Sequence, residues 1–153
     1  MLPDLTATRP RLVVCEDGTE YLDRFQRFLG GAFEFVAAGD CAGALAAARA
    51  ADGLLLDLDF RRTPPERLVD EGGLAPPALD AGSRRRLAET QGILILRQLR
   101  ARGVTLPALL FADLDDDAQA RYLERTLAPL TIASSRLGIV EVASLMRAAL
   151  GGR

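Results

Sequence analysis

The sequence predicts an α/β protein in which one sheet of five parallel strands is covered by helices on both faces. Two observations predict this class. Short apolar runs such as Leu54–Leu56 recur along the chain, and stretches with apolar residues at helical spacing lie between them. Strands that alternate with helices form parallel sheets through right-handed crossovers. A length of 153 residues suits one domain. We expect it at residues 11–150, after a disordered lead-in at residues 1–10.

Three strands are expected in the first part of the chain, each followed by a change of pattern. The third is the clearest, because three consecutive leucines entered through Asp-Gly are typical of a strand buried on both faces. One-face apolar spacing predicts the first helix, and Asp40 is a plausible N-cap for an alanine-rich second helix. The expected strands are Arg11–Glu16, Phe33–Ala37 and Asp52–Asp57, and the expected helices are 21–29 and 41–51.

The alternation breaks after Phe60, and residues 61–91 are expected to form an insertion between the third strand and the third helix. Two Pro-Pro pairs and a Gly-Gly pair exclude one long helix there. Short helical pieces near Glu66–Glu71 and Ser83–Thr90 are compatible with the sequence. A loop of this length inside a domain is often functional or mobile.

The alternation resumes with a largely apolar helix, Gly92–Arg102, which Gly103 ends. The acidic run Asp113–Asp117 is expected to supply the cap and first turn of the next helix, since carboxylates suit the helix dipole. The remaining expected elements are the strands Leu106–Ala112 and Leu130–Ser134 and the helices 118–126 and 139–150.

Composition excludes several functions. The chain has no histidine, which removes the usual general base, the Ser-His-Asp triad and most zinc sites. The net charge of −2 and the pI near 5.2 argue against a nucleic-acid partner. The sequence has neither an apolar run long enough to span a membrane nor a signal peptide at its start, so we expect a cytoplasmic protein without a membrane contact. Cys15 and Cys41 are interpreted as small apolar core residues.

Acidic residues follow two of the expected strands. Glu16 and Asp17 end the first strand, and Asp57 ends the third. In a doubly wound sheet of flavodoxin-like order these strands are neighbours, and ligands bind outside their carboxyl ends. Three carboxylates so close together repel unless a cation or proton intervenes, and Mg²⁺ prefers such oxygen ligands. The alternative is that Glu16 and Asp17 cap the first helix and that Asp57 caps the following segment.

These segments resemble the receiver domains of two-component response regulators over nearly the whole chain. Leu12–Asp17 and Leu54–Asp57 are similar to the family's first and third strands, both of which end in acidic residues. Gly92–Gly103 is similar to its third helix, Leu106–Ala112 to its fourth strand and Gly138–Leu150 to its fifth helix. The order and spacing of the five segments carry the resemblance.

The resemblance implies a function in phosphorelay signalling rather than an enzyme. Asp57 would accept a phosphoryl group from a sensor histidine kinase or phosphotransfer protein. Asp17 would be the main Mg²⁺ ligand, Glu16 would assist directly or through water, and Asp59 would offer its backbone carbonyl. Transfer needs mainly positioning and charge neutralisation, which such a site supplies.

The resemblance also implies how the signal would leave the protein. We expect no output domain after Arg153, so that output would pass through contact with a downstream protein. The family's usual contact face is its fourth helix, fifth strand and fifth helix, which is also an expected homodimer surface. In this chain that face would include Arg121, Tyr122, Arg125 and Arg147.

Three positions depart from the family pattern. Ala112 stands where the family has a Thr or Ser, and Ser135 and Arg136 stand where it has a lysine, usually before a proline. The coupling between phosphorylation and the contact face is therefore expected to be altered. We hypothesise that Arg61, Arg62 or the Arg84–Arg86 run supplies the missing positive charge; the alternative is that the run is a solvated helix face.

Two other functional interpretations remain open. One is a pseudo-receiver that works by protein contacts without phosphoryl transfer. The other is a metal-dependent enzyme, because Asp57-Leu58-Asp59 also resembles the Asp-x-Asp motifs of Toprim-type nucleic-acid enzymes and haloacid-dehalogenase phosphatases. The phosphatases have a later lysine, and this chain has none. The Toprim interpretation requires a basic surface that this acidic chain does not offer.

Overall fold

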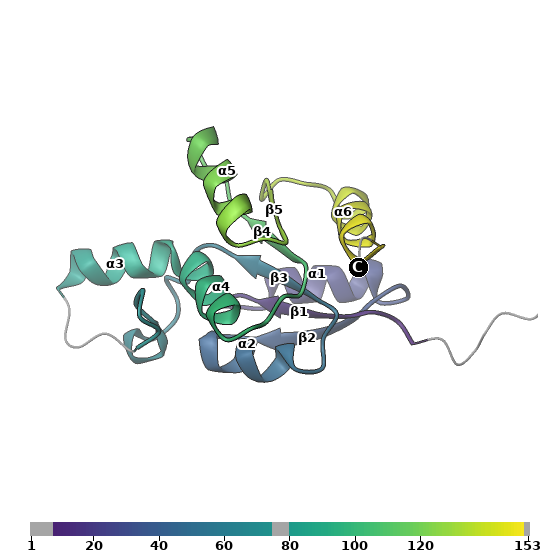
Figure 1. The fold of residues 1–153 in the computed structure, drawn as a ribbon. Coiled ribbons are helices and arrows are strands. Elements are labelled where there is room, and N and C mark those ends of the chain that lie inside the picture. The colour runs from purple at the N-terminus through teal and green to yellow at the C-terminus, as the bar shows by residue number, and fades with distance from the viewer. Residues whose placement is uncertain (1–7, 75–79, 152–153) are drawn as a thin grey trace, which may run out of the picture.

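The computed structural model describes residues 8–74 and 80–151. This part of the chain forms five strands, six α-helices and one short 3₁₀ helix, η1 (Figure 1). The strands are β1 (Arg11–Cys15), β2 (Glu34–Ala38), β3 (Gly53–Asp57), β4 (Ala108–Phe111) and β5 (Leu130–Ala133). The helices are α1 (Glu20–Leu29), α2 (Cys41–Ala48), η1 (Pro65–Arg67), α3 (Ala81–Glu89), α4 (Gln91–Ala101), α5 (Asp117–Thr126) and α6 (Ile139–Gly151).

The strands form one parallel sheet in the order β2-β1-β3-β4-β5. This confirms the predicted doubly wound, flavodoxin-like architecture. β3 is central, and Cys15 of β1 pairs in register with Leu56 of β3. The residues after these two, Glu16 and Asp57, therefore leave the sheet side by side at its carboxyl edge.

Alternate strand residues face opposite sides of the sheet, so the sheet separates two cores. α2, α4 and α5 cover one side, to which α3 adds only Ala88, and α1 and α6 cover the other (Figure 1). Each fully buried leucine stabilises the fold by about 1.5–3 kcal/mol. The buried strand residues of the first core are Val13, Cys15, Ala38, Leu54, Leu56, Ala108 and Leu110. Those of the second core are Leu12, Val14, Phe35, Leu55, Leu109, Phe111 and Ala133. Because Asp57 follows Leu55 by two positions, it lies on the α1 side.

The insertion after β3 begins inside the core and returns to it. Phe60 is fully buried, and its N–H donates to the carbonyl of Ala88 in α3 at 2.8 Å. Gln91 is 1% exposed at the start of α4. Its side-chain amide accepts the N–H of Val69 at 2.8 Å and donates to the Val69 carbonyl at 3.0 Å. These bonds attach both ends of the insertion to the domain, and Figure 1 shows α3 beside α4 at the side of the sheet.

One element differs from the sequence-based expectation: the helical piece near Glu66–Glu71 is only the 3₁₀ turn η1. The expected helical piece at Ser83–Thr90 is present as α3. The acidic run Asp113–Asp117 supplies the cap and first turn of the next helix, as expected: Asp116 caps α5 by accepting the N–H of Ala118 at 2.9 Å, and Asp117 begins its first turn. A run of five consecutive residues offers several acidic caps, and only the backbone path selects one.

Other expectations concern the ends of the chain and its environment. Residues 1–7 of the expected disordered lead-in lie outside the described residues, and Thr8–Pro10 has no regular structure. Within the described chain, none of the helices combines the length and apolarity that a bilayer crossing requires. Both cysteines are buried and unbridged, as the apolar-core interpretation predicted.

Candidate functional site at the carboxyl edge of the sheet

Glu16 lies directly after β1 and is almost fully buried. Its two carboxylate oxygens accept the N–H groups of Tyr21 at 3.1 Å and Leu22 at 2.8 Å, in the first turn of α1. Thr19, the residue at the N-cap position, makes no side-chain capping bond. Glu16 therefore caps α1 from the preceding strand, where the helix dipole favours a carboxylate. Burial raises the pKa of Glu16, and the two N–H bonds oppose that shift.

Asp17 is bound by an arginine of the insertion. Arg62 Nη2 donates to Asp17 Oδ1 at 2.9 Å, and the backbone N–H of Arg62 donates to Asp17 Oδ2 at 3.0 Å. The same guanidinium forms a two-pronged pair with Glu20 of α1, at 2.6 and 2.9 Å. These bonds hold the pKa of Glu20 down to about 2. Glu20 is a site residue that the sequence analysis missed, although its position three residues after Asp17 at a helix start was visible.

Asp57 ends the central strand and faces the same edge. Its Oδ1 accepts the N–H of Leu58 at 2.9 Å. Burial, joined by the neighbouring carboxylates of Asp17 and Asp59, raises the pKa of Asp57 to about 6. No ion pair to Asp57 forms within the described residues, in contrast to Asp17. Asp57 is thus a half-buried carboxylate that is mostly ionised at neutral pH.

These groups surround one hollow of about 520 Å³, open to solvent. Asp59 is paired there with Arg61, whose Nε lies 2.7 Å from Asp59 Oδ2. Of the three carboxylates expected to meet, the structure brings Asp17 and Asp57 to this hollow and directs Glu16 to α1. The side chain of Asp59, for which the resemblance implied only a backbone carbonyl, also lines the hollow. The residues that line the hollow are Asp17, Asp57, Asp59, Arg61 and Arg62.

The side chains as arranged do not fit the magnesium ion that the resemblance implies. Mg²⁺ requires oxygen ligands free to converge on it. Both carboxylate oxygens of Glu16 accept N–H groups of α1, and both of Asp17 accept hydrogen bonds from Arg62. The carboxylate of Asp59 is paired with Arg61. Among residues 8–74 and 80–151, no three acidic or cysteine side chains are grouped so that they could hold a metal.

The ends of β4 and β5 carry the departures noted in the sequence. Ala112 is buried and offers no hydroxyl; its N–H donates to the Ala133 carbonyl at 2.9 Å. Ser134 Oγ donates to Asp113 Oδ1 at 2.9 Å, and the hydroxyl and N–H of Ser135 also bond Asp113. Asp113 therefore joins the loops after two neighbouring strands. The sequence analysis missed this pairing, which the adjacency of β4 and β5 makes possible.

Arg136 and the arginine run lie away from Asp57. Arg136 is exposed after β5 and does not line the hollow. Arg84 and Arg85 line a different hollow, which Arg61 also lines. Arg85 is paired with Glu89 one turn further along α3, at 2.7 Å. Of the arginines that the sequence offered for the missing charge, only those directly after Phe60 lie at the Asp57 hollow.

The four residues expected on the contact face are all exposed, three on α5 and one on α6. Arg121, Tyr122 and Arg125 are exposed on α5, and the Arg125 guanidinium lies 5.6 Å from the centre of the Tyr122 ring. Arg147 of α6 instead lies 5.6 Å from the ring centre of Phe33, just before β2. α5 thus presents an aromatic and basic surface beside the edge strand β5.

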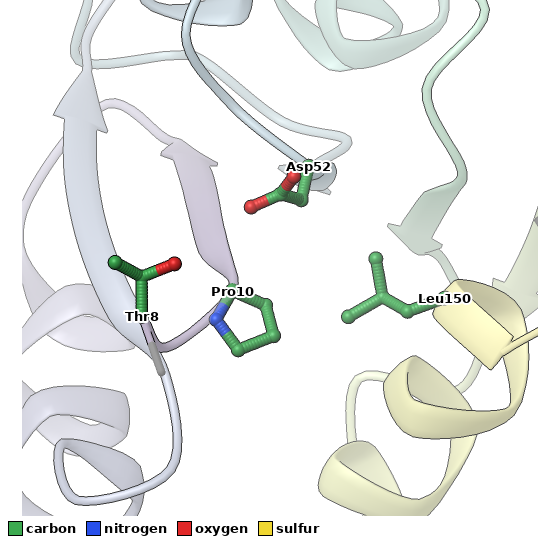
Figure 2. Close-up of a pocket in the computed structure, with 4 residues that line it drawn as sticks. All are labelled: Thr8, Pro10, Asp52 and Leu150. Atoms are coloured by element: carbon green, nitrogen blue, oxygen red, sulfur yellow. The ribbon is translucent and has the colours of Figure 1, made fainter. Parts of the chain in front are cut away.

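Another hollow lies at the opposite edge of the sheet, where the strands begin (Figure 2). Thr8, Pro10, Asp52 and Leu150 line it. Asp52 accepts the backbone N–H of Arg11 at 2.8 Å and so helps to align β1 with the turn before β3. This arrangement is typical of a structural carboxylate.

Comparison with known proteins gives one consistent result. No protein-family model and no curated protein matches the chain. Solved structures do match: the receiver domain of NtrX from Brucella abortus, with a TM-score of 0.66 and 18% identity, covers 93% of this chain and 99% of its own. The receiver domain of Francisella response regulator 1452 has a TM-score of 0.64 and 14% identity, covering 94% and 98%. The signal receiver domain of a LuxO repressor protein from Vibrio parahaemolyticus gives 0.65 and 12%, covering 94% and 92%. The chain therefore has the fold of response-regulator receiver domains.

Proposed function

We propose that the protein is a signalling receiver that accepts a phosphoryl group on Asp57. One observation carries the proposal: a half-buried carboxylate ends the central strand of a receiver fold, and it faces a solvent-open hollow that contains two guanidinium groups. The carboxyl edge of such a sheet is where ligands of this fold class bind. The pKa of Asp57, raised to about 6, leaves the side chain mostly ionised and nucleophilic at neutral pH.

The proposed reaction needs only groups that are at the site and a phosphohistidine on a partner kinase or phosphotransfer protein. A carboxylate oxygen of Asp57 attacks the phosphorus, the P–N bond breaks, and the imidazole leaves with the electron pair. An acyl phosphate on Asp57 results. The hollow gains negative charge, which the guanidinium groups of Arg61 and Arg62 offset. Mg²⁺ stays a prediction from the resemblance, and no step here runs through it.

We propose that the signal then passes to a downstream protein by contact, with α5, β5 and α6 as the expected surface and homodimer face. The exposed Tyr122 and the guanidinium of Arg125 above it form an amphipathic patch of the kind enriched at interfaces. Free buried thiols at Cys15 and Cys41 agree with a reducing compartment such as the cytoplasm.

A second candidate is a pseudo-receiver that binds partners without being phosphorylated. It is favoured by the ends of β4 and β5. Ala112 has no hydroxyl to offer a phosphoryl oxygen, and both Ser134 and Ser135 already donate to Asp113. In this interpretation Asp113 locks the loops that a phosphoryl group would otherwise move.

Intact-mass measurement after incubation with a small phosphodonor such as acetyl phosphate separates the two candidates. The first predicts a gain of one phosphoryl mass in the native chain and none in Asp57→Asn. Asp115→Asn, which neutralises an exposed carboxylate in the loop after β4, is the matched control and should still gain the mass. Absence of any Asp57-dependent adduct, with donor or with phosphohistidine-bearing partner, would support the pseudo-receiver.

A further inference from the structure

Arg62 places a fixed positive charge where the acidic residues after β1 converge. Its guanidinium and its backbone N–H together bond both oxygens of Asp17, which is almost fully buried. The guanidinium also forks onto both oxygens of Glu20. Planar two-pronged pairs of this kind are the strongest geometry for arginine and carboxylate. Arg62 therefore neutralises the charge of Asp17 and donates a hydrogen bond to each of its carboxylate oxygens.

The backbone beneath the guanidinium leaves room for it. A Cβ atom at Gly18 would lie 2.5 Å from Arg62 Nη2 and would also overlap Glu20 Oε2. Any larger residue at position 18 therefore displaces the ends of these side chains. Gly18 thus leaves space for the guanidinium, and the bond from the Arg62 N–H to Asp17 anchors the backbone of the same arginine beside it.

The remaining carboxylates leave a metal ion too few ligands. Glu16 caps α1, and Asp59 is paired with Arg61 at 2.7 Å. Only Asp57 keeps a carboxylate outside an ion pair in this hollow. A divalent cation entering there would also meet the guanidinium groups of Arg61 and Arg62, which line the hollow, and that repulsion weakens its binding.

We propose that Arg62 is a built-in cation that takes the place of a divalent metal, so that the Asp57 hollow excludes Mg²⁺ and works without it. The exclusion of metal rests on the contacts within the hollow, those of Arg62 above all, whereas metal-independent phosphorylation rests also on the function proposed above. Removing the guanidinium would leave Asp17 and Glu20 without their ion-pair partner, close to Asp57 at the same edge. Without the Arg62 side chain, these carboxylates would form a site that binds a divalent cation.

The test measures binding of Mg²⁺ and Mn²⁺, each alone, by calorimetric titration of the full chain. Arg62→Ala is expected to bind either ion at least about tenfold more tightly than the native chain, which is about 1.4 kcal/mol. Arg67→Ala is the matched control, since Arg67 belongs to the same insertion and pairs with Asp40 at 2.8 Å outside the hollow. It should bind metal no better than the native chain.

A second variant keeps the charge but moves it. Gly18→Ala displaces the guanidinium and is expected to raise the affinity for metal by less than Arg62→Ala does. If Arg62→Ala fails to fold, the metal affinity of Gly18→Ala tests the role of Arg62 in its place. Native binding as tight as that of Arg62→Ala overturns the proposal. So does an unchanged affinity in the folded variants, or an equal gain in Arg67→Ala.

Phosphorylation in the presence of EDTA supplies the arm that depends on function. The native chain is expected to gain the Asp57 adduct at the same rate with EDTA as with Mg²⁺. An adduct that forms only with Mg²⁺ overturns metal independence. If no adduct forms in either condition, the proposed phosphoacceptor function fails, while the metal titrations still decide the role of Arg62.

Discussion

Replacing Asp57 with asparagine is expected to stabilise the protein at neutral and alkaline pH. The pKa of Asp57 rises from 3.8 to about 6 on folding. The difference of about 2.2, at about 1.36 kcal/mol per pKa unit, corresponds to about 3 kcal/mol. The side chain is partly open to water, which screens the effect, so about 1–2 kcal/mol is expected. Asparagine keeps an oxygen that accepts the Leu58 N–H.

The pH dependence of this gain provides the sharper test. A carboxylate whose pKa is raised in the folded state contributes full stability below its unfolded pKa, and this contribution is lost as pH rises through the folded value. Urea unfolding of Asp57→Asn and the native chain should therefore differ by about 1–2 kcal/mol near pH 8 and coincide near pH 4. Glu34→Gln, which weakens an exposed pair with Arg11, is the control and should show no gain. No gain near pH 8, or an equal gain near pH 4, would refute the reasoning.

Three further predictions concern the segments that hold the site in place. Gly92→Ala should lower the free energy of unfolding in urea by about 2–4 kcal/mol, because a Cβ atom there overlaps the carbonyl oxygen of Asp57. Gly31→Ala is the control, since its Cβ atom would have open space, and it should lower that free energy far less. Equal losses in the two variants would contradict the overlap. Gln91→Leu should cost about 1–3 kcal/mol and speed proteolysis within the insertion, because three hydrogen bonds to the insertion backbone are lost; unchanged proteolysis would count against this. The guanidinium of Arg100 donates to four backbone carbonyls in the segments between α4 and β5. Arg100→Met should therefore lower the free energy of unfolding by about 2–4 kcal/mol. A melting temperature unchanged from that of the native chain would exclude that role.

The architecture could be predicted because its signals are local. The run Leu54–Leu56, entered through Asp-Gly, is typical of a strand buried on both faces, and one-face spacing identifies most of the helices. Strand adjacency then follows from the parallel topology, so Asp17 and Asp57 were expected at one edge before their positions were known. Element ends were less predictable: the expected strand Leu106–Ala112 is only Ala108–Phe111 in the sheet.

The partners of the site residues could not be predicted, because they depend on the path of the backbone. Arg61 and Arg62 are chemically identical neighbours, yet one pairs with Asp59 and the other with Asp17. The register of the loop after β3 decides this. Whether Glu16 would bind a metal or cap α1 was likewise open until the helix start brought two free N–H groups to it.

The burial of the insertion at both ends has a consequence for the cooperativity of the domain. Phe60 and Leu68 are core side chains, and the amide of Val69 is held by the buried side chain of Gln91. Opening that amide to solvent requires withdrawing these side chains from the interior, which disrupts the packing of β3 and α4. The segment is therefore part of the same folding unit as the sheet, and its Val69 amide hydrogen is expected to exchange at the slow rate of the central strands rather than at that of a surface loop.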